Sequence, residues 1–134
     1  MDRNSAGWPL LRVHHRSAVE WRDVKELVFL EGSANYTWLV WTDDCRLLLP
    51  YTMKTVLASL PAAQFIRLHR RYAVNQRFID QSQSLSDIGR VRLTTGDVCL
   101  PVSRRRRSQL RHQLMEAQTA SGISWLGFAQ RPAP

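Results

Sequence analysis

The sequence predicts a mainly β domain built from antiparallel hairpins, with one short internal helix and one C-terminal helix. Short runs in which apolar and polar residues alternate are separated by turn signals, and only two longer stretches carry helical spacing. The length of 134 residues and an apolar content of 44% suit one domain with a single core. We expect that domain at 10–117, after an N-terminal extension at 1–9 and before a flexible tail at 118–134.

The first half of the domain contains most of the predicted strands. The segment at 36–42, "YTWLVWT", is apolar on both faces, which predicts a central strand covered on both sides. Asp43 and Asp44 then form a turn. The strands expected here are 10–13, 18–21, 26–32, 36–42 and 45–50.

Two helices are indicated by their apolar spacing. The first is expected at 52–60, with Thr52 as its N-cap and Pro61 after its end. The second is expected to run from Ser103 to about Ala117. Its buried face would hold Leu110, Leu114 and Ala117.

Between the helices, "FIRLHRRYAVNQRFI" at 65–79 begins as a strand and then loses its alternation at Arg70 and Arg71. A helical turn is expected within 70–78. After it, 88–95 alternates and "TGDV" indicates a hairpin that leads into 98–103. The predicted inward residues are Val91 and Leu93, and the outward ones are Arg90 and Arg92.

The charge of the chain favours a polyanionic partner. Nineteen basic residues face eleven acidic ones, and nearly all the basic residues are arginine, which suits bidentate contacts to phosphate and guanine. An arginine-rich genome would be the alternative explanation of the arginine-to-lysine ratio.

Other classes of function find little support. Cys45 and Cys99 belong to no metal-binding pattern, so neither a metal nor a cofactor is expected, and a reducing compartment is indicated. No signal peptide or membrane-spanning run is present, which predicts a soluble, cytoplasmic protein without membrane contact. Catalytic motifs are missing as well, so we do not expect an enzyme.

The run "PVSRRRRSQL" is unfavourable unless an anion binds it. If Ser103 caps the helix, four arginines fill its first turn, where the helix dipole already presents positive potential. A phosphate would offset that repulsion, because a helix N-terminus offers free N–H groups. The alternative is a solvated charged face. The four residues are Arg104, Arg105, Arg106 and Arg107.

A second basic cluster surrounds Arg70, which lies where a strand gives way to a turn and so can project from a rigid base. Beside it, Arg67 and Arg71 are candidates to bind phosphate. His69 is more typical of a packed histidine, although it is also a candidate phosphate contact. Asn75 is expected to tie the following turn to backbone groups.

These segments resemble the LytTR (LytR/AlgR-type) DNA-binding domain of bacterial transcription regulators. "FIRLHRRYAVNQRFI" is similar to the family signature F-x-R-x-H-R-S-Y/F-x-V-N-x-x-x-I. "DVKELVFLEGSANY", "TMKTVLASLP" and "TTGDVCLPVSRRRRSQLRHQL" resemble further family segments in the same order, so that residues 10 to about 117 are covered. The resemblance implies an elongated fold of antiparallel strands that binds double-stranded DNA through loops in successive major grooves.

The resemblance also implies individual roles. Arg70 and Arg104 correspond to base-contacting positions, and the loop after Glu31 supplies a third contact. The candidates in that loop are Asn35, Tyr36 and Thr37, with Thr37 the closest by position.

Arg71 departs from the family pattern, because it replaces the usual serine of the signature. The family also implies repeated half-sites, with two protomers on one DNA. No receiver domain can be assigned, so we expect a stand-alone regulator controlled by expression, by a separate regulatory protein or through its terminal extensions.

Two alternatives remain at this level. One is a module for RNA or single-stranded nucleic acid, in which exposed aromatic side chains stack on bases. The other is a protein adaptor whose basic face meets an acidic partner.

Overall fold

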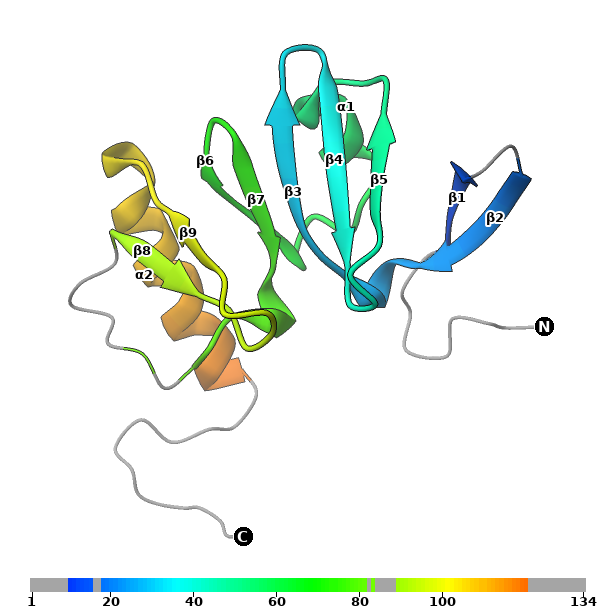
Figure 1. Ribbon diagram of the computed structural model, residues 1–134. Helices are drawn as coiled ribbons and strands as arrows, with labels where there is room; N and C mark the ends of the chain where they lie inside the picture. The colour runs from blue at the N-terminus through cyan, green and yellow to red at the C-terminus, as the bar shows by residue number, and fades with distance from the viewer. Residues whose placement is uncertain (1–9, 16–17, 82, 84–88, 121–134) are drawn as a thin grey trace, which may run out of the picture.

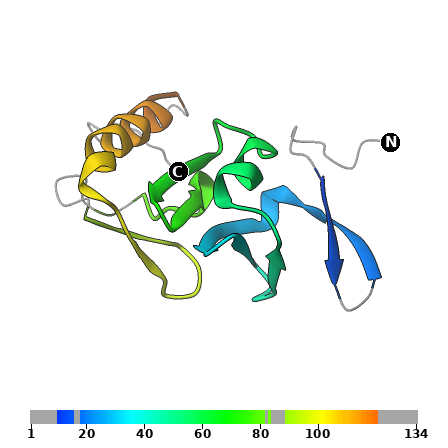
Figure 2. The same ribbon diagram turned by 90° about the horizontal axis from the view of Figure 1, so that it is seen from above.

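Three antiparallel sheets follow one another across the molecule in the computed structural model (Figure 1). The structure describes residues 10–15, 18–81, 83 and 89–120. The extension at 1–9 and the tail from 121 onward lie outside the described residues. Seen from above, the sheets still lie in a row, with α2 at one end and the β1–β2 hairpin at the other (Figure 2). This arrangement is the elongated, mainly β fold that the sequence predicted.

The central sheet has five strands in the order β5-β4-β3-β7-β6. Each of its strands pairs antiparallel with its neighbours. The strands are β3 (Leu27–Ser33), β4 (Tyr36–Trp41), β5 (Arg46–Leu49), β6 (Phe65–His69) and β7 (Tyr72–Asn75).

One element of this sheet differs from the prediction. The helical turn predicted within 70–78 is present only at its end, whereas Tyr72–Asn75 form strand β7 between β6 and β3. Ala73, Val74 and Asn75 are all buried, so the segment has no alternation to reveal its period. A 3₁₀ turn at Gln76–Phe78 follows the strand.

Two hairpins flank the central sheet. At one end, β1 (Leu10–His15) pairs with β2 (Ala18–Asp23), and a 3₁₀ turn at Val24–Glu26 leads from β2 into β3. At the other end, β8 (Arg90–Arg92) pairs with β9 (Cys99–Pro101) through the predicted turn, in which Gly96 has φ +72°. Val91 and Leu93 are buried as predicted, and Arg90 and Arg92 are exposed.

The two helices belong to two apolar cores on opposite faces of the central sheet, since neighbours such as Ala73 and Val74 point into different cores. Helix α1 (Met53–Ala58) begins at Thr52, whose hydroxyl accepts from the Thr55 N–H as expected of an N-cap. It packs Met53 and Val56 against Leu39 and other residues of β3 and β4. Helix α2 (Arg104–Ala120) packs Leu110 and Leu114 onto β6, β8 and β9, and it continues past the predicted end near Ala117.

The predicted central strand β4 is covered unequally. Thr37, Leu39 and Trp41 are buried against α1, whereas on its other face Trp38 is half-buried and Tyr36 is 48% exposed. The second face of β4 is therefore less buried than its apolar residues had predicted.

Asn75 joins β7 to the rest of the sheet, as the sequence predicted. Its amide nitrogen donates to the Leu27 carbonyl at 2.9 Å, and its side-chain oxygen accepts from the Arg77 N–H at 3.2 Å. The side chain is fully buried, so its bond to Leu27 forms away from water. They fix the base of the β6–β7 hairpin, whose other end carries Arg70 and Arg71.

Candidate nucleic-acid interface

Three segments that are distant in sequence meet at the upper edge of the molecule in Figure 1: the β3–β4 turn, the β6–β7 turn and the start of α2. An open depression of about 470 Å³ joins Ser33 and Ala34 to Arg70 and Arg71. A second depression, of about 360 Å³, lies on the other side of Arg70. Its walls are His69, Arg70, Ser103, Arg105 and Arg106. We call this surface the arginine edge; it comprises the residues predicted to contact DNA at 35–36, 70 and 104–107.

The β6–β7 turn consists of Arg70 and Arg71 and is fixed by side chains of its own hairpin. The Arg67 guanidinium donates to the carbonyls of His69 and Arg70, at 2.8 and 2.6 Å. The ring nitrogen Nδ1 of His69 accepts from the Arg71 N–H at 3.1 Å. Because the backbone on both sides of Arg70 is held, its side chain projects from a defined base.

The surroundings of Arg67 differ from the exposed position expected of a phosphate ligand. It is half-buried, and burial is the main cause that lowers its pKa from the ordinary value, with a further contribution from the nearby charge of Arg106. Its donors bind turn carbonyls, so this side chain supports the turn instead of facing outward as a phosphate ligand.

Arg70 and Arg71 differ in what their side chains contact. Arg70 is exposed, and its guanidinium has no carboxylate partner among the described residues. Arg71 pairs with Glu31 at 3.3 Å and donates to the Gly32 carbonyl at 3.3 Å. The position that departs from the family signature is thus the one that reaches across to the neighbouring strand.

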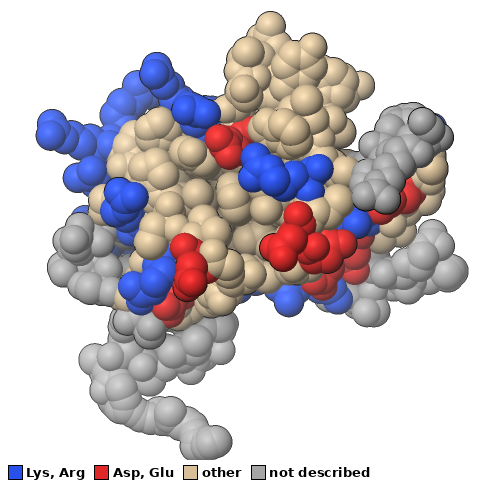
Figure 3. Space-filling model, in the orientation of Figure 1, with Lys and Arg blue, Asp and Glu red and all other residues tan. Residues whose placement is uncertain are grey.

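The start of α2 brings its arginines beside the turn. The Ser103 N–H donates to the Leu68 carbonyl at 2.9 Å, which attaches the helix start to β6. Arg104 and Arg105 are exposed and Arg106 is half-buried. Figure 3 shows basic side chains gathered over this part of the molecule. Arg107 turns back, and its Nε donates to the Val102 carbonyl at 3.3 Å.

The β3–β4 turn supplies two exposed candidates, Asn35 and Tyr36. Ala34, at the tip, has φ +55°, a left-handed conformation that is unfavourable for a residue with a Cβ. Asp44 and Asp97 have positive φ in other turns, so this conformation suits a tight turn and does not by itself mark a site. Thr37 is a correction: it is 0% exposed and its hydroxyl donates to the Tyr51 carbonyl at 2.8 Å, so it cannot reach a base.

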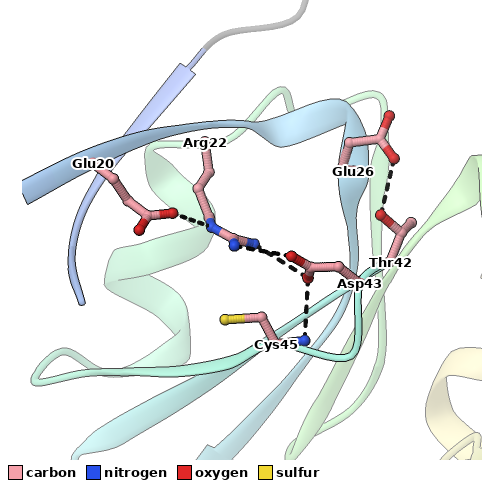
Figure 4. Close-up of polar contacts among 6 residues, drawn as sticks. All are labelled: Glu20, Arg22, Glu26, Thr42, Asp43 and Cys45. Atoms are coloured by element: carbon pink, nitrogen blue, oxygen red, sulfur yellow. Dashed lines mark hydrogen bonds and ion pairs between the residues drawn. The ribbon is translucent and has the colours of Figure 1, made fainter. Parts of the chain in front are cut away.

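The far end of the central sheet contains an arginine in the opposite situation (Figure 4). Arg22 donates to Glu20 at 2.6 Å and to Asp43 at 3.0 Å, and its guanidinium lies 5.1 Å from the ring centre of Trp41. The hydrogen bond to Asp43 is the main cause that raises the pKa of Arg22, and the same bond lowers the pKa of Asp43. Sequence reasoning missed this cluster, because Glu20 and Arg22 lie on β2 whereas Trp41 and Asp43 lie at and after the end of β4, about 20 residues further along the chain.

Within the described part of the chain, no helix is long and apolar enough to cross a bilayer. No group of three or more His, Cys, Asp or Glu residues is placed to hold a metal ion there.

A mainly β fold whose loops and helix start form a basic edge is suited to a polyanionic ligand such as nucleic acid. The profile of the LytTr DNA-binding domain matches residues 12–115. The chain therefore belongs to the LytTR family of DNA-binding domains.

Structural comparison agrees with this assignment. The chain is similar to a solved LytTr DNA-binding domain from Bacillus cereus, with a TM-score of 0.66 and 20% sequence identity over 81% of this chain and 98% of the other. At that identity the likeness concerns the fold. A comparison with curated proteins found no match.

Proposed function

We propose that the protein is a sequence-specific transcription regulator that reads successive major grooves of duplex DNA with its arginine edge. The main support is the depression where Arg70, Arg105 and Arg106 converge, since none of its described lining residues is acidic. Three guanidinium groups beside a helix N-terminus repel one another unless an anion lies between them. The phosphates of DNA supply that anion.

Arg70 and Arg104 are the proposed base readers. Both are exposed, and both lie near the junction where the Ser103 N–H bonds the Leu68 carbonyl, since Arg104 directly follows Ser103 and Arg70 is two residues after Leu68. Arginine contacts guanine through two parallel hydrogen bonds in the major groove. Asn35 and Tyr36 would add a contact from the β3–β4 turn.

Phosphate contacts are assigned to Arg105 and Arg106, and to the Nη groups of Arg107, whose Nε alone bonds the Val102 carbonyl. His69 is a further candidate: because its Nδ1 accepts a backbone hydrogen bond, the proton of the neutral ring lies on Nε2, which is free to donate to a phosphate oxygen. Contacts of this kind set affinity and salt dependence without selecting sequence.

We further propose that two protomers bind repeated half-sites, in the cytoplasm where the DNA lies, and that a separate protein or the terminal segments regulate binding. These points depend on family membership. No contact between copies is needed for the groove-reading role.

Selection of binding sites from a random duplex pool tests the proposal, followed by gel shifts on the selected site at about 0.15 M salt. We expect one recurring motif, present twice at a fixed spacing. Arg70→Ala or Arg104→Ala should weaken binding by about 1 to 3 kcal/mol and relax preference at one position. Recovery of no motif, or equal competition by single-stranded RNA, would contradict the proposal.

A further inference from the structure

Arg71 is the residue at which this chain departs from the family signature, and its contacts suggest a task other than binding phosphate. Its Nε donates to the Gly32 carbonyl at 3.3 Å, and its Nη2 lies 3.3 Å from Oε2 of Glu31. The Gly32 N–H donates back to the Arg71 carbonyl at 2.8 Å. Main chain and side chain of Arg71 thus both bind the end of β3.

Glu31 is placed to hold this guanidinium. Its side chain is 24% exposed, compared with 52% for Arg71, so the carboxylate is the more fixed partner. Its other oxygen, Oε1, lies 3.6 Å from Nη2 of Arg46 on β5, and the Arg46 guanidinium lies over Trp38 at 5.0 Å from the ring centre. A rotation of the Glu31 side chain would therefore disturb its contact with Arg46 as well as its contact with Arg71.

These contacts join two segments of the arginine edge. Glu31 and Gly32 lead directly into the β3–β4 turn that carries Asn35, and Arg71 is the second residue of the turn that carries Arg70. A side chain that ties one turn to the other fixes the spacing between Arg70 and the β3–β4 turn. A serine at 71 lacks the length to reach Glu31.

We propose that Arg71 and Glu31 form a latch that holds the two turns at a fixed separation, which makes Arg71 a positioning residue and a determinant of sequence preference. This inference rests on the proposed function for its effect on DNA, although the latch itself exists in the free protein. The alternative is that Arg71 contacts phosphate and Glu31 merely neutralises it in the absence of DNA.

Salt titrations of DNA affinity distinguish the two roles. The variants are Arg71→Ser, Arg71→Lys and Glu31→Gln, and the matched control is Arg105→Ala, an exposed arginine proposed to contact phosphate. A lost phosphate contact lowers the slope of log K against log salt by about 0.9, which we expect for Arg105→Ala. For Arg71→Ser we expect an unchanged slope. Its preference for the selected site, measured against a site altered at the base that Arg70 contacts, should fall about 2- to 10-fold.

The conservative variants sharpen the test. Lysine keeps the charge but cannot donate to Gly32 and Glu31 together from one planar group, so Arg71→Lys should restore less than half of the lost preference, in logarithmic terms. Glu31→Gln should lower preference about 2- to 5-fold with no change of slope. If Glu31→Gln instead tightens binding to all sequences and steepens the slope, or Arg71→Lys restores preference fully, the latch is wrong.

A readout without DNA separates failure of the latch from failure of the proposed function. Amide hydrogen exchange at Gly32 should accelerate about 2- to 10-fold in Arg71→Ser and stay unchanged in Arg105→Ala. Unchanged Gly32 exchange in Arg71→Ser would overturn the latch whatever the DNA results. A wild-type protein that binds no duplex, with accelerated Gly32 exchange in the variant, would overturn the function and leave the latch standing.

Discussion

Arg22, on β2 and bonded to the turn after β4, and Arg70, in the β6–β7 turn, lie at opposite ends of the molecule and show two uses of the same side chain. Arg22 is bound by two carboxylates and covers the ring of Trp41, with 18% of its side chain exposed. Arg70 is exposed, lies beside Arg105 and Arg106, and has no carboxylate partner in the described part of the chain. The surface reflects this difference, since acidic side chains in Figure 3 gather away from the start of α2.

The comparison separates arginines that stabilise the fold from arginines whose charge is compensated only when an anion binds. A guanidinium whose charge is already compensated contributes to stability, and its removal exposes carboxylates and an aromatic face. A guanidinium that faces like charges lowers stability until an anion arrives. Mutation of Arg22 should therefore lower stability with little effect on DNA affinity, whereas mutation at the arginine edge should lower DNA affinity without lowering stability.

The largest expected effect is on DNA binding at the arginine edge. The double variant Arg70→Ala/Arg104→Ala should lose about 2 to 6 kcal/mol of binding free energy on the selected site if the two contacts add. Its thermal midpoint should remain within a few degrees of wild type, because neither side chain supports the core. Gel shifts and calorimetry on the same preparation measure both. A loss of folding would contradict the division between the ends.

Arg22→Met should produce the reverse pattern. We expect the free energy of unfolding to fall by about 1 to 3 kcal/mol, since Glu20 and Asp43 lose the hydrogen bonds from Arg22 and Trp41 loses a stacked cation. Urea unfolding measures the loss. DNA affinity at fixed salt should change less than about twofold once the folded fraction is equal, because Arg22 lies far from the arginine edge. A larger change in DNA affinity would show that Arg22 influences the arginine edge.

Arg105→Ala should stabilise the free protein while it weakens DNA binding. Removing one cation from the first turn of α2 should raise the free energy of unfolding by about 0.3 to 1 kcal/mol at low salt. The gain should shrink as salt is added, because salt screens the repulsion. Urea unfolding at two salt concentrations measures it; a destabilised variant would show that Arg105 has a structural partner.

Asp43→Asn should give the smallest effect, and a pH-dependent one. Because the hydrogen bond from Arg22 lowers the Asp43 pKa below its ordinary 3.8, the carboxylate stabilises the fold above that value. This stability is lost as the pH falls through the still lower folded pKa. The half-exposed pair should contribute at most about 1 kcal/mol near pH 7. Wild type and variant should converge in stability once the pH has fallen below that lowered pKa; a difference that does not change with pH would show that the charge of the carboxylate is not its source.

Elements with clear periodicity could be predicted from the sequence. The Thr52 cap, the buried Leu110 and Leu114, and the hairpin that buries Val91 and Leu93 all follow from local pattern. Strand β7 could not, because a buried segment without alternation resembles a helical turn. Asn75 was predicted as structural because its amide suits a turn, and the buried bond to Leu27 confirms that role.

Residues of the candidate site were harder to assign. Arg67, Arg70 and Arg71 are the same residue type in the same hairpin, so the sequence does not distinguish their roles. In the structure Arg67 supports the turn, Arg70 projects from it and Arg71 binds Glu31. Those roles depend on partners that are distant in sequence or on which way the turn folds. Thr37 was misassigned because position alone does not reveal that β4 buries it.

Backbone amide chemical shifts of the full chain, recorded while its selected duplex is added, test most directly whether the arginine edge binds DNA. If it does, the largest changes cluster at 34–36, 69–71 and 103–107, and the β1–β2 hairpin and the surroundings of Arg22 are unchanged. Changes centred on β1, β2 and Arg22, with Arg70 and Arg104 unaffected, would contradict this binding mode.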